Sequence, residues 1–92
     1  MDTWNVYMVR CSDGTLYTGI AMDVERRVVE HNTNDALAAR YTRARRPVML
    51  VHQEKYATRS AASKREYEIK QMGKKEKLVL LTAGPNITGS TC

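Results

Sequence analysis

The stretch WNVYMVRCSDGTLYTGIA, residues 4–21, decides the fold of this 92-residue chain. Residues 4–11 are rich in β-branched and aromatic side chains, as strands are, and residues 16–20 share this character. The intervening SDGT is a turn sequence with an Asp-Gly pair at its centre. The stretch therefore predicts a β-hairpin at the start of the chain.

The register of this hairpin decides where its two tyrosines point. A two-residue loop would place Tyr7 and Tyr17 on opposite faces of the sheet. A type I turn followed by a G1 bulge, with Gly14 in the left-handed conformation, shifts the pairing by one residue. Val9 is then opposite Tyr17, and Tyr7 is opposite Gly19, so both phenols share one face. We predict this second register.

A helix follows the hairpin, with Asp23 as its N-cap, and extends to about residue 31 or 32. The residues Val24, Arg27, Val28 and His31 have i, i+3, i+4, i+7 spacing and form one stripe of this helix. An arginine on such a stripe is unusual unless the stripe faces a cleft. Arg27 and His31 are therefore candidate site residues.

The middle of the chain joins this helix to a third strand. Residues 32–46, NTNDALAARYTRARR, are polar and basic and show no convincing periodicity. Pro47 ends this connection, and VMLVHQEKY, residues 48–56, reads as a strand. Both faces of this strand begin with apolar residues, so we expect it to be central in the sheet. His52 is expected to be an ordinary strand residue.

The last third of the chain predicts two more helices. Ser60 is a suitable N-cap for a helix over residues 61–72, and Gly73 is a suitable stop for it. KKEKLVLL, residues 74–81, restarts as a short helix. The element order is ββαβαα.

This order predicts an α+β fold, with a three-stranded antiparallel or mixed sheet flanked by helices. Residues 1–82 are expected to form a single domain, because a chain of this length supports one modest core. Residues 83–92, AGPNITGSTC, contain little to bury, so we expect a disordered tail.

Composition favours a polyanionic partner. The chain has 15 Lys and Arg against 10 Asp and Glu, a net charge of +5. A basic run surrounds Tyr41 and consists of Arg40, Arg43, Arg45 and Arg46. This run is either a solvated loop or an edge that contacts phosphates and offers a ring for stacking.

Cysteine use and hydropathy point to the cytoplasm. Cys11 and Cys92 have no zinc-site spacing, so we expect free thiols in a reducing compartment, with an adventitious disulfide as the alternative. MDTWNVYMVR lacks the pattern of a signal peptide, and the longest apolar run, residues 78–81, is far too short to span a membrane. No membrane association and no small-molecule cofactor are expected, and a monomer is slightly favoured.

The motifs together resemble the GIY-YIG nuclease family. NVY at residues 5–7 stands for the first tripeptide and YTG at 17–19 for the second, and DVERRVVEH and AASKREYEIK follow at the family's spacing. ARYTRARRPVMLVHQEKY, residues 39–56, is similar to the middle segment of the small stand-alone bacterial members of the YhbQ type. The resemblance covers about residues 4–81.

The resemblance implies a DNA endonuclease that uses one Mg²⁺ or Mn²⁺ ion, held weakly until substrate oxygens join it. It implies low sequence specificity, with DNA, including branched or damaged DNA, as partner. The alternative is a nucleic-acid-binding module with weak or no cleavage, and a basic protein–protein adaptor is a third reading. The roles implied are metal binding for Glu66, phosphate contact for Arg27, proton transfer for Tyr17, orientation of that phenol for His31, lining of the site for Tyr7 and close backbone approach for Gly19.

The chain departs from the family pattern at several positions. Asn5 and Val6 replace the glycine and isoleucine of the first tripeptide, and Thr18 replaces the isoleucine of the second. Arg40 stands where small relatives tend to have lysine. The only late asparagine, Asn86, lies in the expected tail and receives no role. Glu68 remains the alternative metal ligand, although Glu66 shares a helix face with Ala62 and Ile69 and is preferred.

Overall fold

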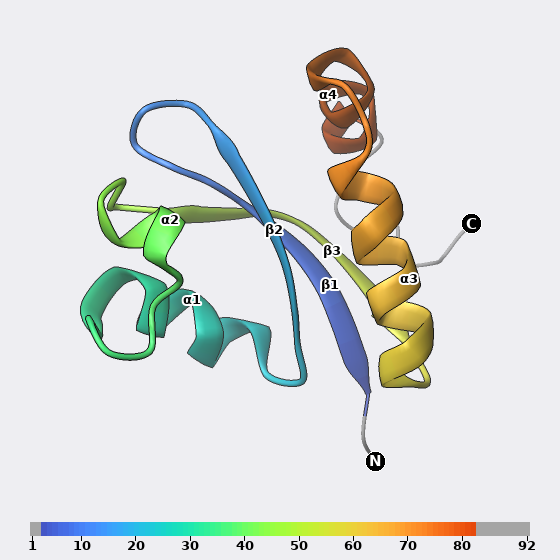
Figure 1. The fold of residues 1–92 in the computed structure, drawn as a ribbon, viewed down its shortest axis with the longest axis horizontal. Helices are drawn as coiled ribbons and strands as arrows, with labels where there is room; N and C mark the ends of the chain where they lie inside the picture. Colours follow the sequence, from blue (N-terminus) through green and yellow to red (C-terminus); the bar gives the residue numbers. More distant parts are fainter. Residues whose placement is uncertain (1–2, 83–92) are drawn as a thin grey trace.

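The computed structural model describes residues 3–82, which form three strands and four helices (Figure 1). The predicted tail at 83–92, with Asn86 and Cys92, lies outside the described residues. Cys11 is a free, buried thiol. The elements are β1 (Trp4–Arg10), β2 (Leu16–Ala21), α1 (Val24–Thr33), α2 (Arg40–Arg43), β3 (Met49–Tyr56), α3 (Arg59–Lys70) and α4 (Lys74–Thr82).

The three strands form an antiparallel sheet in the order β2-β1-β3, which confirms the predicted fold class. β1 is the central strand, and its residues 5–9 are all buried, because they are covered on both faces. The prediction that the third strand is central was wrong. β3 is an edge strand, and only its first residues carry the apolar pattern that suggested a central position.

The hairpin has the predicted register. Val9 pairs with Tyr17 and Tyr7 with Gly19. Gly14 has φ 85°, the left-handed conformation that the bulge requires. The carboxylate of Asp13 accepts hydrogen bonds from the Thr15 backbone N–H (3.1 Å) and hydroxyl (2.6 Å), which closes the turn.

Helices cover the two faces of the sheet as two groups (Figure 1). On the face of α1, the buried core consists of Tyr7, Val9, Cys11, Val24 and Val48. On the face of α3 and α4, it consists of Val6, Met8, Ala62 and Ile69, joined by partly buried residues that include Leu80 and Leu81. Neighbouring residues of β1 thus contribute to opposite cores, as strand geometry requires.

The helix ends show which local signals were correct. Asp23 caps α1 by accepting a hydrogen bond from the Arg26 N–H (3.0 Å), as predicted. The N-cap of α3 is Thr58, which accepts from Ala61 N–H (3.1 Å), so the choice of Ser60 was wrong. The one-turn helix α2 was not predicted, because four residues are too few to show a period. The restart at 74, directly after Gly73, is confirmed.

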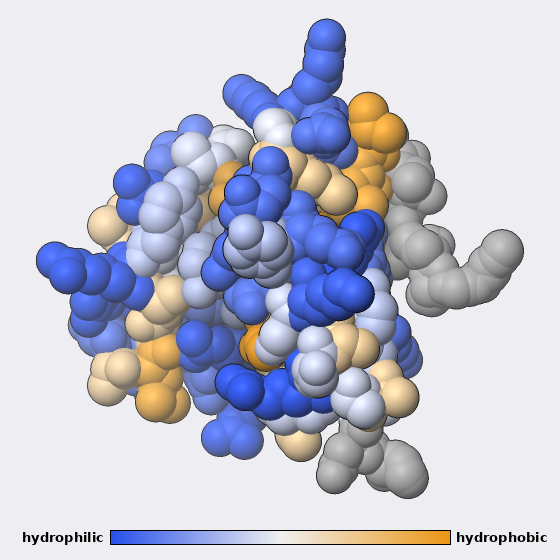
Figure 2. Space-filling model, turned by 45° about the vertical axis from the view of Figure 1, so that its right-hand side comes forward, coloured by the Kyte–Doolittle hydropathy of each residue, from blue (hydrophilic) through white to orange (hydrophobic). Residues whose placement is uncertain are grey.

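The surface is largely hydrophilic on the side where α3 and α4 come forward (Figure 2). An apolar patch lies over α4, where Leu78 and Val79 are exposed, and smaller apolar spots are scattered elsewhere on this side (Figure 2). Within residues 3–82, no helix combines the length and the hydropathy needed to cross a membrane.

Candidate active site

The Tyr7 hydroxyl lies at the centre of the candidate site. It is within hydrogen-bond distance of His31 Nε2, at 2.7 Å, in a buried environment. The ring leans across β2, because a Cβ built on Gly19 would lie 2.7 Å from the Tyr7 oxygen and 2.9 Å from its Cζ. Only glycine leaves room for this phenol, which explains why position 19 is occupied by glycine.

Three further predicted residues act electrostatically on the same hydroxyl. Burial raises the pKa of Tyr7 to about 12, and the phenol of Tyr17 and the carboxylate of Glu66 add to this effect. The guanidinium of Arg27 is also close enough to act on it and opposes the rise. Tyr7 therefore keeps its proton at neutral pH. The groups that act on this hydroxyl come from β2, α1 and α3, and the hydroxyl itself from β1.

His31 is held by two hydrogen-bonding groups and is fully buried. Besides Tyr7, it has the Thr42 Oγ1 2.8 Å from Nδ1. Burial, followed by the positive charge of Arg27, lowers the pKa of His31 to about 4, so the ring is neutral at pH 7. Its hydrogen bond is to Tyr7, whereas its contact with Tyr17 is an edge-on ring contact with centroids 5.5 Å apart.

The hydroxyl of Thr42 determines which ring nitrogen of His31 carries the proton. It donates to the Ala39 carbonyl (2.9 Å), which leaves its oxygen to accept from His31 Nδ1–H. Nε2 then accepts from the Tyr7 hydroxyl. The Ala39 N–H also faces Nδ1 and would favour the tautomer in which Nδ1 accepts. At 3.4 Å, however, this contact is much longer than the hydrogen bonds of Thr42 to His31 (2.8 Å) and to the Ala39 carbonyl (2.9 Å).

Thr42 is a site residue that the sequence reasoning missed. It is completely buried, although Arg40 and Arg43 of the same short helix are exposed. The available signal was one uncharged residue in the basic YTR stretch, and that signal alone points to no partner. Its role depends on α2 being packed beside α1, which only the tertiary structure reveals.

Arg27 is oriented by one hydrogen bond within α1 and one to the segment that follows α1. Its Nη1 donates to Glu30 Oε1 (3.1 Å) and to the Leu37 carbonyl (2.6 Å). Both bonds use one nitrogen of the guanidinium, so the other donors remain available to Tyr7 or to an anion. A planar fork in this setting suits two oxygens of a phosphate.

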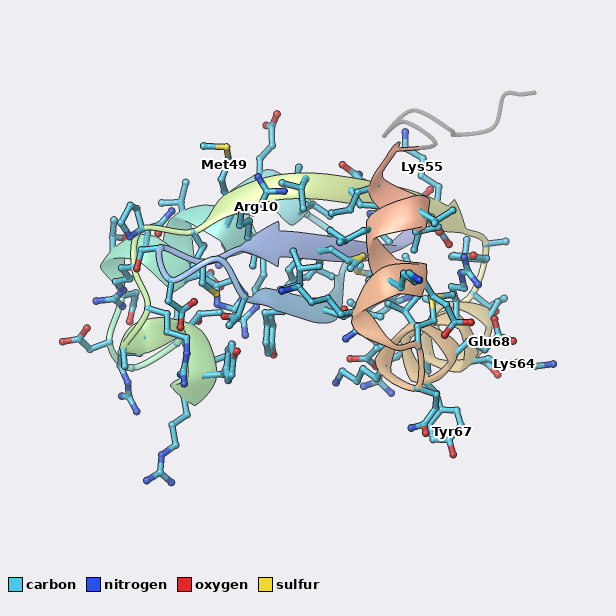
Figure 3. The ribbon with its side chains drawn as sticks, turned by 90° about the horizontal axis from the view of Figure 1, so that it is seen from above. Arg10, Met49, Lys55, Lys64, Tyr67 and Glu68 are labelled. Carbon is cyan, nitrogen blue, oxygen red and sulfur yellow. The ribbon has the colours of Figure 1, made fainter. Side chains whose placement is uncertain are left out.

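Glu66 and Glu68 differ in environment. The Glu66 side chain is 22% exposed and pairs with Lys70, with Oε2 and Nζ 3.0 Å apart. Glu68 is 51% exposed and pairs with Arg65 at 3.2 Å. In Figure 3, Lys64 and Tyr67 point outward from α3. Glu66 is one of the groups that raise the pKa of Tyr7, which agrees with its preference over the more exposed Glu68 as a site residue.

The donor set fits a hard divalent ion bound through one carboxylate. Within residues 3–82, no three His, Cys, Asp or Glu side chains gather into a cage. Mg²⁺ commonly keeps several waters and uses substrate phosphate oxygens, so one carboxylate such as that of Glu66 is sufficient as the protein ligand.

An ionic cluster on β3 fixes the position of α3. Glu54 accepts from Arg65 at two points (2.9 and 3.2 Å), from Tyr56 (2.6 Å) and from His52 Nε2 (2.7 Å). Burial alone would raise the pKa of Glu54, but the bonds from His52, Arg65 and Tyr56 outweigh it and lower the pKa to about 2. His52 is thus a buried member of this cluster. Because Arg65 precedes Glu66, the cluster holds the part of α3 that carries Glu66.

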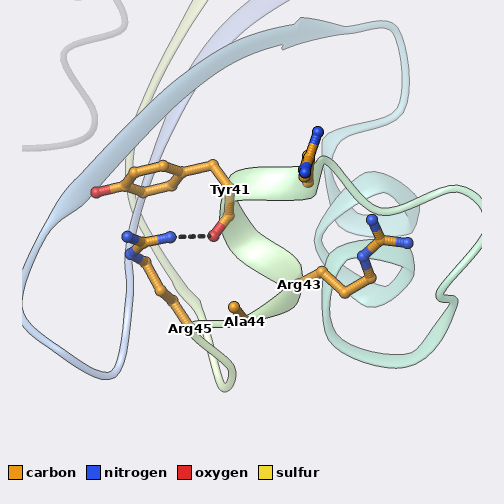
Figure 4. A pocket seen from close by; sticks show the side chains of 5 residues that line it. Tyr41, Arg43, Ala44 and Arg45 are labelled. Carbon is orange, nitrogen blue, oxygen red and sulfur yellow. Dashed lines mark hydrogen bonds between the residues drawn. The ribbon is translucent and has the colours of Figure 1, made fainter.

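The basic segment around α2 forms a groove of about 600 Å³ (Figure 4). The Tyr41 ring stacks on Tyr17, with centroids 5.9 Å and planes 20° apart. Arg45 Cζ lies 3.9 Å from the Tyr41 centroid, and its Nη1 donates to the Tyr41 carbonyl (3.0 Å). A nucleobase would therefore meet a preformed stack rather than a free ring. The residues that line the groove are Arg40, Tyr41, Arg43, Ala44 and Arg45.

Arg46 is separated from this groove by its contacts. Its Nε donates to the His31 carbonyl (2.6 Å) and its Nη1 pairs with Asp35 (2.8 Å). These bonds tie the α2 segment to the end of α1. The structure thus brings four of the five predicted nucleic-acid contacts together and gives Arg46 a different place.

Comparisons with known proteins are consistent with this geometry. The model of the family described as "GIY-YIG catalytic domain" matches residues 3–78. A UPF0213 protein of Desulfotalea psychrophila is 58% identical over 80 residues, which cover 87% of this chain and 72% of the relative. A UPF0213 protein of Staphylococcus saprophyticus is 50% identical over 84 residues, which cover 91% of this chain and all of the relative.

Two solved structures are similar as well. The solution NMR structure of a UPF0213 protein from Bacillus halodurans has a TM-score of 0.59 and 33% identity, over 91% of this chain and 87% of the other. That of a protein from E. faecalis has a TM-score of 0.60 and 36% identity, over 90% of each chain. Small single-domain bacterial proteins thus share both the sequence and the fold.

Proposed function

This chain belongs to the GIY-YIG family, and we propose that it is a divalent-metal-dependent endonuclease that hydrolyses phosphodiester bonds in DNA. One observation carries the proposal. The buried Tyr7 hydroxyl is hydrogen-bonded to the imidazole of His31, and the phenol of Tyr17, the guanidinium of Arg27 and the carboxylate of Glu66 all affect its pKa. A phenol, a cation and a carboxylate around one point are the groups that phosphodiester hydrolysis needs.

Arg27 binds the scissile phosphate. Its guanidinium donates to the phosphoryl oxygens, where negative charge develops as the attacking oxygen bonds to phosphorus. The contacts to Glu30 and the Leu37 carbonyl hold it in place before the substrate arrives, so little ordering is needed on binding.

Tyr17 transfers the proton of the attacking water. As the water oxygen bonds to phosphorus and the bond to the leaving sugar oxygen breaks, the half-buried phenol accepts the water's proton and releases its own to solvent, and the leaving oxygen takes up a proton from solvent. Tyr7 is not assigned this step, because its hydroxyl is buried away from solvent and its pKa is raised to about 12, so it stays protonated at neutral pH. Tyr7 and His31 instead form a buried, hydrogen-bonded support for the site.

Glu66 would hold the Mg²⁺ or Mn²⁺ ion, which when bound supplies positive charge at the phosphoryl oxygens. Lys70 competes for this carboxylate in the free protein, since the two side chains are 3.0 Å apart. Weak binding of the ion without DNA follows from that competition.

The substrate contacts favour low sequence specificity. Arg40, Arg43 and Arg45 offer charges to the phosphate backbone, which carries no sequence information. Branched or damaged DNA, in which a strand is already exposed, is the form of substrate we propose. A DNA substrate in a bacterial cell places the enzyme in the cytoplasm.

A second candidate is a nucleic-acid-binding module with weak or no cleavage. The observation that favours it is the ion pair between Glu66 and Lys70, together with the absence of a larger cluster of metal-binding side chains within residues 3–82. Such a protein would use the groove beside α2 without completing the chemistry.

Nicking of supercoiled plasmid in Mg²⁺ or Mn²⁺ separates the two candidates. We expect the wild type to nick and Glu66→Gln to be inactive. Glu68→Gln is the matched control on the same helix and is expected to retain activity. Tyr17→Phe should reduce the nicking rate by about 100-fold or more, the usual contribution of a proton-transfer group. DNA binding by the wild type without nicking in either metal would leave only the binding module.

A further inference from the structure

A second cationic groove lies between the hairpin turn and α4, on the face of the sheet opposite to α1. It has a volume of about 400 Å³. Arg10 at the end of β1 and the lysines 74 and 77 of α4 provide its charges, and Leu16 and Leu78 provide its apolar wall. The residues that line it are Arg10, Asp13, Gly14, Thr15, Leu16, Lys74, Lys77 and Leu78.

The cations of this groove have no acidic partner within residues 3–82. All eight ion pairs of the described chain involve other residues, and neither Arg10 nor either lysine takes part in a side-chain hydrogen bond there. The one carboxylate that lines the groove, Asp13, is already engaged by Arg45 and Thr15. The groove therefore has excess positive charge and donors that remain open to an anion.

The two lysines of this groove lie at the N-terminal end of α4, where the helix dipole disfavours a positive charge. Lys74 and Lys77 are in the first turn of α4, at the positive end of the helix dipole, with only Glu76 as an acidic neighbour there. A sequence selected for the stability of this helix would place acidic residues at these positions. A ligand that needs the positive charge is a physical reason for this arrangement.

The hairpin turn links this groove to the groove beside α2. Asp13 lines the first and is 3.1 Å from Arg45, which lines the second. Leu16 lines the first and precedes Tyr17, whose side chain is on the opposite face of β2. The two basic grooves thus flank the turn end of edge strand β2, with Tyr17 between them.

We propose that the groove of Arg10, Lys74 and Lys77 binds the phosphate backbone of the DNA on the side of the scissile phosphate away from the α2 groove. The inference rests on the proposed function, because it extends the path of the same substrate. Leu16 and Leu78 lie against the sugar edge, and the lysines contact successive phosphates. DNA held at both grooves crosses β2 at Tyr17.

The salt dependence of DNA binding tests this proposal. Fluorescence anisotropy with a labelled duplex in EDTA measures affinity without cleavage. Each phosphate contact contributes about 0.9 to the slope of log K against log salt. The double variant Lys74→Glu/Lys77→Glu should therefore lower the slope by about 2 and weaken binding about 50-fold at 0.1 M salt. Its melting temperature should be unchanged or higher, because glutamate suits the first turn of a helix.

The double variant Lys55→Glu/Lys64→Glu is the matched control. It has the same net charge, and its lysines lie on β3 and on the outward side of α3 (Figure 3). We expect an unchanged slope. The groove proposal would be overturned by an unchanged salt-dependence slope in the Lys74 and Lys77 variant, or by an equal fall of the slope in both variants. Neither outcome would bear on the proposal that the protein is an endonuclease. Failure of the wild type to bind any DNA would instead remove the DNA substrate on which both proposals depend.

Discussion

Substitution of Gly19 by alanine tests the geometry on which the candidate site depends. The added methyl carbon would lie 2.7 Å from the Tyr7 oxygen, 2.9 Å from Cζ and 3.1 Å from Cε2. Normal contacts between carbon atoms are near 3.5–4.0 Å. The phenol cannot swing aside freely, because its rigid ring is buried and its hydroxyl is bonded to His31.

The cost has two parts. Forcing the ring out of its position is overpacking of a well-packed core, which costs about 1–3 kcal/mol. Displacing the hydroxyl also breaks the hydrogen bond between Tyr7 and His31, which is worth about 1 kcal/mol. Gly19→Ala should therefore destabilise the protein by about 2–4 kcal/mol, and its melting temperature should fall by about 10 °C or more.

Urea unfolding of a double-mutant cycle with Tyr7→Phe provides the measurement. Phenylalanine removes the oxygen that the methyl group meets and has already lost the hydrogen bond to His31. The two substitutions together should thus cost about 1 kcal/mol less than the sum of the single changes. Gly73→Ala is the control, since its nearest neighbour would be Glu76 Oε1 at 3.9 Å, and we expect a cost of about 1 kcal/mol or less, because alanine is a poorer residue than glycine just before α4. A similarly small effect of Gly19→Ala, or strict additivity with Tyr7→Phe, would refute the packing argument.

Two further predictions concern buried ionisable groups. The pKa of His31 falls from 6.5 to about 4 on folding. Between these two values the unfolded chain binds a proton at His31 and the folded chain does not. The free energy of unfolding should therefore fall by about 2.5 kcal/mol as the pH is lowered from 7 to 4.5. Unfolding of His31→Gln by urea across this window should show a smaller loss, and an equal loss would contradict the assignment. Glu54→Gln should cost about 3 kcal/mol because it leaves Arg65 without its buried partner, whereas the exposed control Glu68→Gln should cost about 0.5 kcal/mol or less. Equal stability of the two glutamine variants in the same unfolding assay would argue against a clamp on α3.

Local chemistry accounts for the parts of the fold that could be predicted. The left-handed Gly14 and the resulting register follow from the turn sequence alone, and this register puts Tyr7 and Tyr17 on one face. Asp23 was identifiable as a cap because its carboxylate needs only the next turn of its own helix. Each of these features depends on residues within one short segment.

The missed features depend on distant segments. Thr58 and Ser60 are both good capping residues. Thr58 is the cap because β3 ends at Tyr56 and α3 already begins at Arg59, and the sequence around the two residues does not reveal how short this connection is. The edge position of β3 depends on its pairing with β1, which its own apolar pattern does not encode. The burial of Thr42 depends on the packing of α2 beside α1 and on a hydrogen bond to His31, eleven residues earlier in the chain.

The sheet edge explains how residues from opposite faces act on one point. Tyr7 belongs to the central strand and to the core under α1, whereas Glu66 belongs to a helix that packs on the other face. A side chain on a central strand would normally be shielded from the opposite face. Because Gly19 has no side chain, the Tyr7 ring lies over edge strand β2, and the carboxylate of Glu66 contributes to its raised pKa. The glycine of the second tripeptide thus does more than permit backbone approach: it leaves the space that the phenol of the first tripeptide occupies.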